Sequence, residues 1–220
     1  MGLTLKPIVA DFRLKVSYKE AMLSLVELEE KRIPLVRNIL EIYDLRLDDI
    51  KFNREALSGN FIQFIKHYDS ALFGVHFGLE ETSSDVFRAK SEKQAFDLYG
   101  KLFQILDEIP ISSLTINIGQ QLSAEADLEL FLESLNPNPP DGFRDLLSGR
   151  GVQYNLRIPN HNLSMYVILA SSMFYDKALY LNIEYQFSPY IYDFQASLKV
   201  VMEYYSLALK ELGIHVQREE

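Results

Sequence analysis

The sequence predicts an α+β fold in which helices lie on one face of one or two antiparallel sheets. Three observations carry this prediction. Several stretches alternate apolar with polar residues, which is the pattern of strands with one wet face. None of these stretches is the continuous apolar run of a sheet that is covered on both faces. Other stretches repeat apolar residues at helical spacing.

The first alternating stretch runs from residue 6 to residue 18. Ser17 and Glu20 then form a capping-box pattern, so a helix should begin there, and Pro34 should end or interrupt it. Residues 35–57 give a mixed pattern, which we interpret as a connection with some helix. The order at the N-terminus therefore begins with a strand and a helix.

A hairpin follows around Asp69 and Ser70. If its loop has two residues, Gln63 lies opposite His76. A helix should start at Ser91 and stop before Pro110, and residues 111–122 alternate as a strand. The order through residue 122 is then β-α-β-β-α-β, which is that of a ferredoxin-like unit.

The second half, residues 123–220, predicts a short acidic helix, a three-stranded antiparallel sheet and a long closing helix. The polar stretch at 136–140, "NPNPP", is the best internal boundary. Residues 152–172 should form a hairpin and residues 177–187 a third strand. The closing helix has an apolar seam of Phe194, Leu198, Val201, Tyr205, Ala208 and Leu212, with Gly213 as its C′ residue. Residues 1–122 and 123–220 form two domains or one continuous domain. No internal repeat is evident beyond a loose recurrence of strands followed by a helix.

Composition argues against several classes of protein. The chain of 220 residues has no cysteine, which excludes disulfides and thiolate metal sites and fits a reducing cytoplasm. Its formal net charge is −9, so a partner with a phosphate backbone is not expected, and we predict no nucleic-acid binding. No stretch is long and apolar enough for a membrane span, and the N-terminus lacks the apolar region of a secretory signal. We expect a cytoplasmic protein without a membrane partner.

Motifs for catalysis are missing from the sequence. The four histidines, His67, His76, His161 and His215, have no partner at the spacing that metal sites use, so we expect no metal and no cofactor. The chain also has no G-x-S-x-G motif. No catalytic residue can be nominated from these patterns.

Polar side chains follow one face of several predicted strands. Asp11, Arg13 and Lys15 form one such row, and Thr115 and Asn117 form another. The candidate ligand- or partner-binding residues are Asn117, Gln153, Asn155, Arg157, Asn182, Glu184 and Gln186. Such a face could be a plain solvent face, an interaction or oligomer surface, or a ligand pocket. Short amides are less favoured in strands than β-branched residues, which favours a specific role.

The chain resembles a family of uncharacterised, sporadically distributed prokaryotic proteins of about this length. The stretches that carry the resemblance are "VADFRLKV", "SEKQAFDLYGKLFQIL", "SLTINIGQQL", "LYLNIEYQF" and "FQASLKVVMEYYSLALKELG". The resemblance implies the order of elements over most of the chain. It implies no activity and no catalytic residue.

Two hypotheses on function follow. The first is a non-catalytic binding or regulatory module that acts on a protein partner or associates with itself. The second is a hydrolase or transferase with a dispersed polar pocket on the sheet face, around Arg157 and Glu184. The two hypotheses differ in whether these side chains share one pocket.

Overall fold

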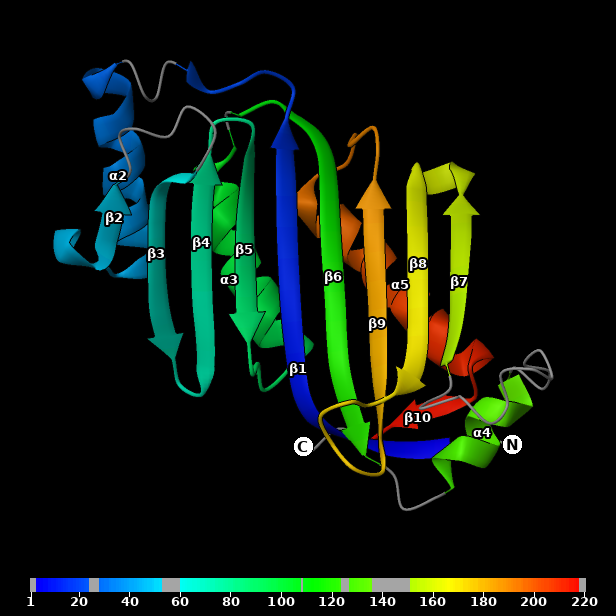
Figure 1. Cartoon of the computed structure of the whole chain (residues 1–220). Coiled ribbons are helices and arrows are strands. Elements are labelled where there is room, and N and C mark those ends of the chain that lie inside the picture. The colour runs from blue at the N-terminus through cyan, green and yellow to red at the C-terminus, as the bar shows by residue number, and fades with distance from the viewer. Residues whose placement is uncertain are drawn as a thin grey trace.

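The computed structural model describes residues 3–23, 28–52, 60–107, 109–123, 127–135 and 151–217. Ten strands form one sheet in the order β2-β3-β4-β5-β1-β6-β9-β8-β7, and β10 pairs with β1 (Figure 1). All neighbouring strands are antiparallel except β1 and β10. The strands are β1 (Leu3–Tyr18), β2 (Ile50–Phe52), β3 (Asn60–Tyr68), β4 (Ala71–Gly78), β5 (Glu81–Phe87), β6 (Ile111–Ser123), β7 (Gly151–Ile158), β8 (Leu163–Ser171), β9 (Ala178–Phe187) and β10 (Ile214–Val216).

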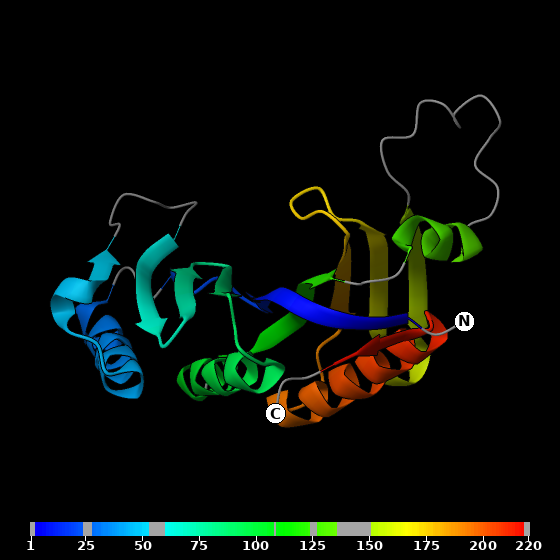
Figure 2. The ribbon, with the colours of Figure 1, turned by 90° about the horizontal axis from the view of Figure 1, so that it is seen from below.

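Three helices cover one face of this sheet: α2 (Glu29–Tyr43), α3 (Glu92–Ile105) and α5 (Phe194–Glu211) (Figure 2). The short helix α4 (Leu128–Leu135) lies on the other side, near β7 and β8. Of two short 3₁₀ helices, Leu47–Asp49 lies between α2 and β2, and Pro159–His161 connects β7 with β8. We call the face away from α2, α3 and α5 the open face.

Alternation along the strands explains which face is covered. Phe12, Leu14 and Val16 of β1 are buried under the helices, whereas Arg13 and Lys15 between them are exposed on the open face. The same alternation buries five side chains of β9: Leu179, Leu181, Ile183, Tyr185 and Phe187. Burial of the apolar side chains drives the helices onto this side, because removal of apolar surface from water is the main favourable term in folding.

The two halves of the sheet have the same topology. Outward from the central pair of β1 and β6, one half runs β5, β4, β3 and the other β9, β8, β7. In both halves the outermost of these three strands comes first in the chain, and a helix, α3 or α5, follows the innermost. Because β1 and β6 are antiparallel, the halves are related by an approximate two-fold axis normal to the sheet. The loose recurrence of strands followed by a helix in the sequence did not predict this structural repeat.

Several predictions of local structure are confirmed. The hairpin of β3 and β4 has the expected register, with Gln63 opposite His76. Ser91 caps α3, since its side chain accepts a hydrogen bond from the Gln94 N–H at 3.2 Å. The hairpin of β7 and β8, the strand β9 and the closing helix all form. The seam of the closing helix is buried, and Gly213 adopts the positive φ of 69° that a C′ residue requires.

Two predictions at the N-terminus are wrong. Ser17 does not cap a helix, because it pairs with Ser113 and Glu81 inside the sheet. Pro34 does not end a helix either but lies inside α2, which begins at Glu29. Pairing on both sides of β1 overrides the local capping pattern.

The ferredoxin-like order is not confirmed, since the order through β6 contains two further strands, β2 and β5, and all ten strands share one sheet. The strand β5 was not predicted, because two of its buried residues on the helix side, Thr82 and Ser84, are polar and hide the alternation of apolar and polar residues. The Ser84 hydroxyl donates to the Gly74 carbonyl at 3.0 Å, and Thr82 shares a hydrogen bond with the Tyr18 hydroxyl. The proposed boundary at 136–140 lies outside the described residues.

Candidate functional site

The centre of the open face carries three rows of paired, mostly polar residues; two rows cross four neighbouring strands and the third crosses three. In the middle row, Glu184 of β9 pairs with Asn117 of β6, which pairs with Arg13 of β1, which pairs with Asp85 of β5. The row on one side runs Gln186, Thr115, Lys15 and Ser83, and the row on the other side begins Asn182, Gly119 and Asp11. Residues far apart in the sequence are therefore brought together by strand order.

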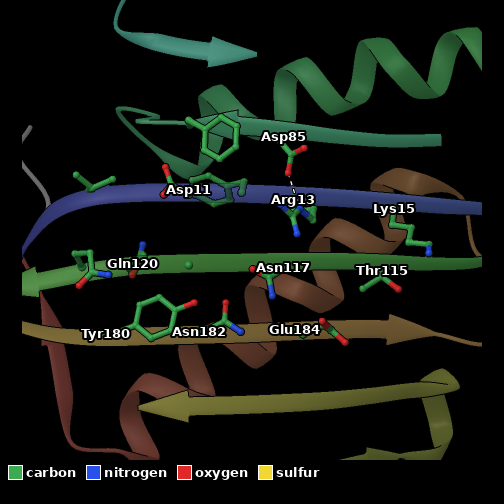
Figure 3. A pocket seen from close by; sticks show the side chains of 15 residues that line it. Asp11, Arg13, Lys15, Asp85, Thr115, Asn117, Gln120, Tyr180, Asn182 and Glu184 are labelled. Atoms are coloured by element: carbon green, nitrogen blue, oxygen red, sulfur yellow. Dashed lines mark hydrogen bonds and ion pairs between the residues drawn. The ribbon is translucent and has the colours of Figure 1, made fainter. Parts of the chain in front are cut away.

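Most residues of these rows line a hollow of about 510 Å³ (Figure 3), but Gln186 and Ser83 do not. The side chains of Asp11, Arg13, Asn117, Asn182 and Glu184 surround its centre. The other residues along it are Val9, Phe12, Lys15, Asp85, Phe87, Thr115, Gly119, Gln120, Gln121 and Tyr180. The hollow lies over the central strands, where the two halves of the sheet meet.

The two cations of this region already have partners. Nε of Arg13 lies 2.6 Å from Oδ1 of Asp85, and Nζ of Lys15 lies 2.6 Å from Oε2 of Glu81. The hydrogen bond and charge of Asp85 raise the pKa of Arg13. The positive charges on β1 are thus offset by carboxylates on β5.

Two other carboxylates at the hollow, Asp11 and Glu184, form no ion pair with any residue in the described part of the chain. Oδ1 of Asp11 accepts the backbone N–H of Arg88 at 3.0 Å. Partial burial, together with the charge of Asp11, raises the pKa of Tyr180, so its hydroxyl stays protonated near neutral pH. The hollow therefore keeps two negative charges beside neutral amides and a phenol.

Gly119 forms part of the floor of the hollow. A methyl group built on its Cα would lie 3.6 Å from Oδ1 of Asn182 and 3.6 Å from the Asp11 carbonyl oxygen, which are ordinary contacts. Packing in the free protein thus does not require glycine here. Glycine weakens a strand, and it is found where another group approaches the backbone closely. The space above Gly119 is available to a ligand atom.

The structure separates the predicted site residues into two groups. Asn117, Asn182 and Glu184 line the hollow, and Gln186 lies in the next row beside Thr115. Gln153, Asn155 and Arg157 lie on the same face but on β7, at the edge of the sheet. The polar row of β7 and the hollow are separated by β8.

The two residues predicted for a catalytic pocket, Arg157 and Glu184, lie in different groups. Glu184 is on β9 and lines the hollow, whereas Arg157 is on β7 and does not. Arg157 pairs with Ser164 of β8, which in turn pairs with Gln186 rather than with Glu184. The structure therefore does not bring Arg157 and Glu184 into one pocket.

Several residues of the hollow were not predicted as part of a polar row, and Asp85 and Tyr180 are two of them. Asp85 lies on β5, where polar residues on both faces concealed the alternation. Tyr180 precedes the polar row of Asn182 on β9, and it was not counted in that row because an aromatic residue is typical of the apolar face of a strand. The sequence did contain a signal for Tyr180: it lies two positions before Asn182 in a strand, and residues two positions apart point to the same face.

The tyrosines near the closing helix form two separate groups. Tyr192 and Tyr204 both lie near the ring of His161, with centroid distances of 6.1 and 6.0 Å. Tyr205 faces the sheet instead, where its hydroxyl donates to Oε1 of Gln120 at 2.7 Å. This second contact is buried and joins α5 to β6.

Within the described ranges, no group of three or more histidine, aspartate or glutamate side chains could hold a metal ion. Among the helices that can be described, none has the length and apolar character needed to cross a bilayer. Comparisons with known proteins found no family model that matches this chain and no curated relative. The resemblance to an uncharacterised prokaryotic family stays a prediction.

Proposed function

We propose that this chain is a cytoplasmic, non-catalytic binding module whose hollow on the open face receives a positively charged side chain, lysine or arginine, from a protein partner. The observation that carries the proposal is the pair of carboxylates, Asp11 and Glu184, which form no ion pair within the described part of the chain although two cations lie beside them.

Chemistry of the hollow supports a cationic ligand. Carboxylates accept hydrogen bonds only, and asparagine side chains supply further acceptor oxygens. A guanidinium or ammonium group offers several donors and gains charge-assisted hydrogen bonds with such acceptors. The space over Gly119 leaves room for its approach. The formal net charge of −9 would also accelerate association with a basic partner.

The test measures binding of a short arginine peptide by calorimetry, with a glutamate peptide of the same length as a control. We expect the arginine peptide to bind and the glutamate peptide not to bind. Glu184→Gln should weaken binding about tenfold or more, because a hydrogen bond to a charged group contributes about 1.5–3 kcal/mol. Glu203→Gln removes the same charge from the exposed side of α5 and should have little effect.

Two further measurements sharpen the test. Gly119→Ala should reduce binding without loss of stability, since the added methyl group makes only ordinary contacts. A small polyamine carries the same charges without a peptide chain, and tighter binding of the polyamine would assign the site to a small cation instead. Equal effects of the Glu184 and Glu203 substitutions would show unspecific attraction and would contradict the proposal.

A further inference from the structure

The two edges of the sheet are built differently. On one side, β2 has only three residues and carries an exposed lysine, Lys51, and both features discourage pairing with another chain. On the other side, β7 has eight residues, with neither proline nor lysine, and its outer side pairs with no strand of the described residues. Residues 153–157 are all exposed. Toward the described part of the chain, this edge offers a row of free backbone donors and acceptors.

The middle of β7 also lacks cover on its helix side. Tyr154 and Leu156 are 40% and 43% exposed, whereas their cross-strand partners on β8, Val167 and Met165, are 2% and 3% exposed. Val152 near the start of β7 is buried, so the buried layer reaches β7 there and stops at β8 along the middle of the strand. Two apolar side chains at the end of a layer leave the edge suited to a partner strand that continues both the sheet and the layer.

We propose that β7 pairs with β7 of a second copy of this chain, antiparallel and centred on Asn155. The sequence of β7, "GVQYNLRI", is symmetric in residue type about this position. In that register Tyr154 lies opposite Leu156, Val152 opposite Ile158, and Gln153 opposite Arg157 of the second copy. Apolar residues meet apolar residues on the helix side, and polar residues meet on the open face.

Neighbouring registers fit less well. A shift of one residue in the pairing would place the apolar side chains of one copy on the open face of the other. Centring on Tyr154 would leave Ile158 without an apolar partner in the strand. In the register centred on Asn155 the arginines do not face each other, so no like charges are opposed. The two open faces then form one continuous surface, with the two hollows at a fixed separation.

Analytical ultracentrifugation of the full chain tests the association. We expect the native protein to sediment as a dimer at high concentration and Asn155→Glu to sediment as a monomer, since two glutamates would then face each other across the axis. Asn38→Glu makes the same charge change on the exposed surface of α2 and should remain a dimer. A monomeric native protein, or a dimer that survives Asn155→Glu, would overturn the proposal.

The absence of cysteine permits a direct test of the register. Paired antiparallel positions place Cα atoms about 4.5–5.5 Å apart, within the range that a disulfide spans. Asn155→Cys should form a disulfide dimer under mild oxidation, and Asn38→Cys should not. A mixture of Gln153→Cys and Arg157→Cys should give mainly the mixed dimer. Circular dichroism checks that each variant folds. Failure of Asn155→Cys to react faster than Asn38→Cys, or a preference for unmixed dimers, would overturn the assigned pairing.

Discussion

The outer strands of the two halves, β3 and β7, occupy equivalent places in one topology but have different surroundings. In the first half, α2 lies over β3, and Tyr43 of α2 packs against Phe64 and Phe73 at centroid distances of 5.1 Å each. In the second half, α4 lies on the opposite side of the sheet, and Tyr154 and Leu156 of β7 stay exposed. In each half a helix precedes the outer hairpin. The helix of the first half, α2, covers β3, whereas the helix of the second half, α4, does not cover Tyr154 and Leu156 of β7.

This difference shows that topology alone does not decide what an edge can do. The first half closes its edge with a helix and a three-residue strand. The second half leaves an eight-residue edge with two apolar side chains. The closed edge favours stability of the monomer, and the bare edge favours association with another strand.

The largest expected effect is loss of stability at alkaline pH, and most of it should originate in the first half. Burial raises the pKa of Tyr18, Tyr43 and Tyr99 of the first half, and of Tyr185 of the second half, above the usual value for tyrosine. Because the folded protein holds these protons more tightly than the unfolded chain, the contribution is complete below pH 10 and is lost as the pH rises above it. Each tyrosine should remove about 1.4 kcal/mol per pH unit, so unfolding should follow within about two units.

Urea melts at a series of pH values check this expectation. Tyr43→Phe removes one of these four titrating groups and should flatten the dependence on pH by about a quarter. A free energy of unfolding that stays constant between about pH 10 and 12 would contradict the burial of these hydroxyls.

The second prediction compares the outer strands directly. Phe64→Ala in β3 should cost about 3–5 kcal/mol, because a fully buried aromatic ring leaves a cavity. Leu156→Ala in β7 should cost less than about 1 kcal/mol in the monomer, since the side chain is 43% exposed. Urea melts at low protein concentration measure both values. Similar costs at the two positions would show that the outer strands are equally covered.

A third prediction concerns the contact between α5 and β6. Tyr205→Phe removes the donor to Oε1 of Gln120 and leaves that oxygen buried without this partner. We expect a loss of about 1–3 kcal/mol, the usual cost of an unsatisfied buried group. The double variant with Gln120→Leu should recover part of the loss. No recovery in the double variant would argue against a direct interaction of the two side chains.

The smallest effect is expected in the hollow. Asn182→Thr should be nearly neutral for folding, because the side chain lies on the open face and threonine favours strands. Urea melts of the native protein and of Asn182→Thr measure the difference in free energy of unfolding. A cost above about 1 kcal/mol would indicate that the amides form a structural network instead of a binding surface.

The sequence by itself determined the local periodicities. Alternation predicted β1, β6 and β9, the symmetry of the hairpin around Asp69 predicted the pairing of Gln63 with His76, and the stripe of α5 predicted its buried face. These features depend on residues close together in the chain. The order Asn182, Glu184, Gln186 also predicted a polar face.

Only the tertiary structure decided the rest, because it depends on which strands become neighbours. Strand β5 is stable with buried Thr82 and Ser84 because Tyr18 and the Gly74 carbonyl supply their hydrogen bonds. The hollow exists because β1, β6 and β9 lie side by side, which brings Asp11 near residues more than a hundred positions away. Arg157 and Glu184 belong to polar rows of the same kind in the sequence, but β8 lies between their strands, β7 and β9. Pairing between distant segments is set by burial and hydrogen bonding over the whole sheet, and no local pattern encodes it.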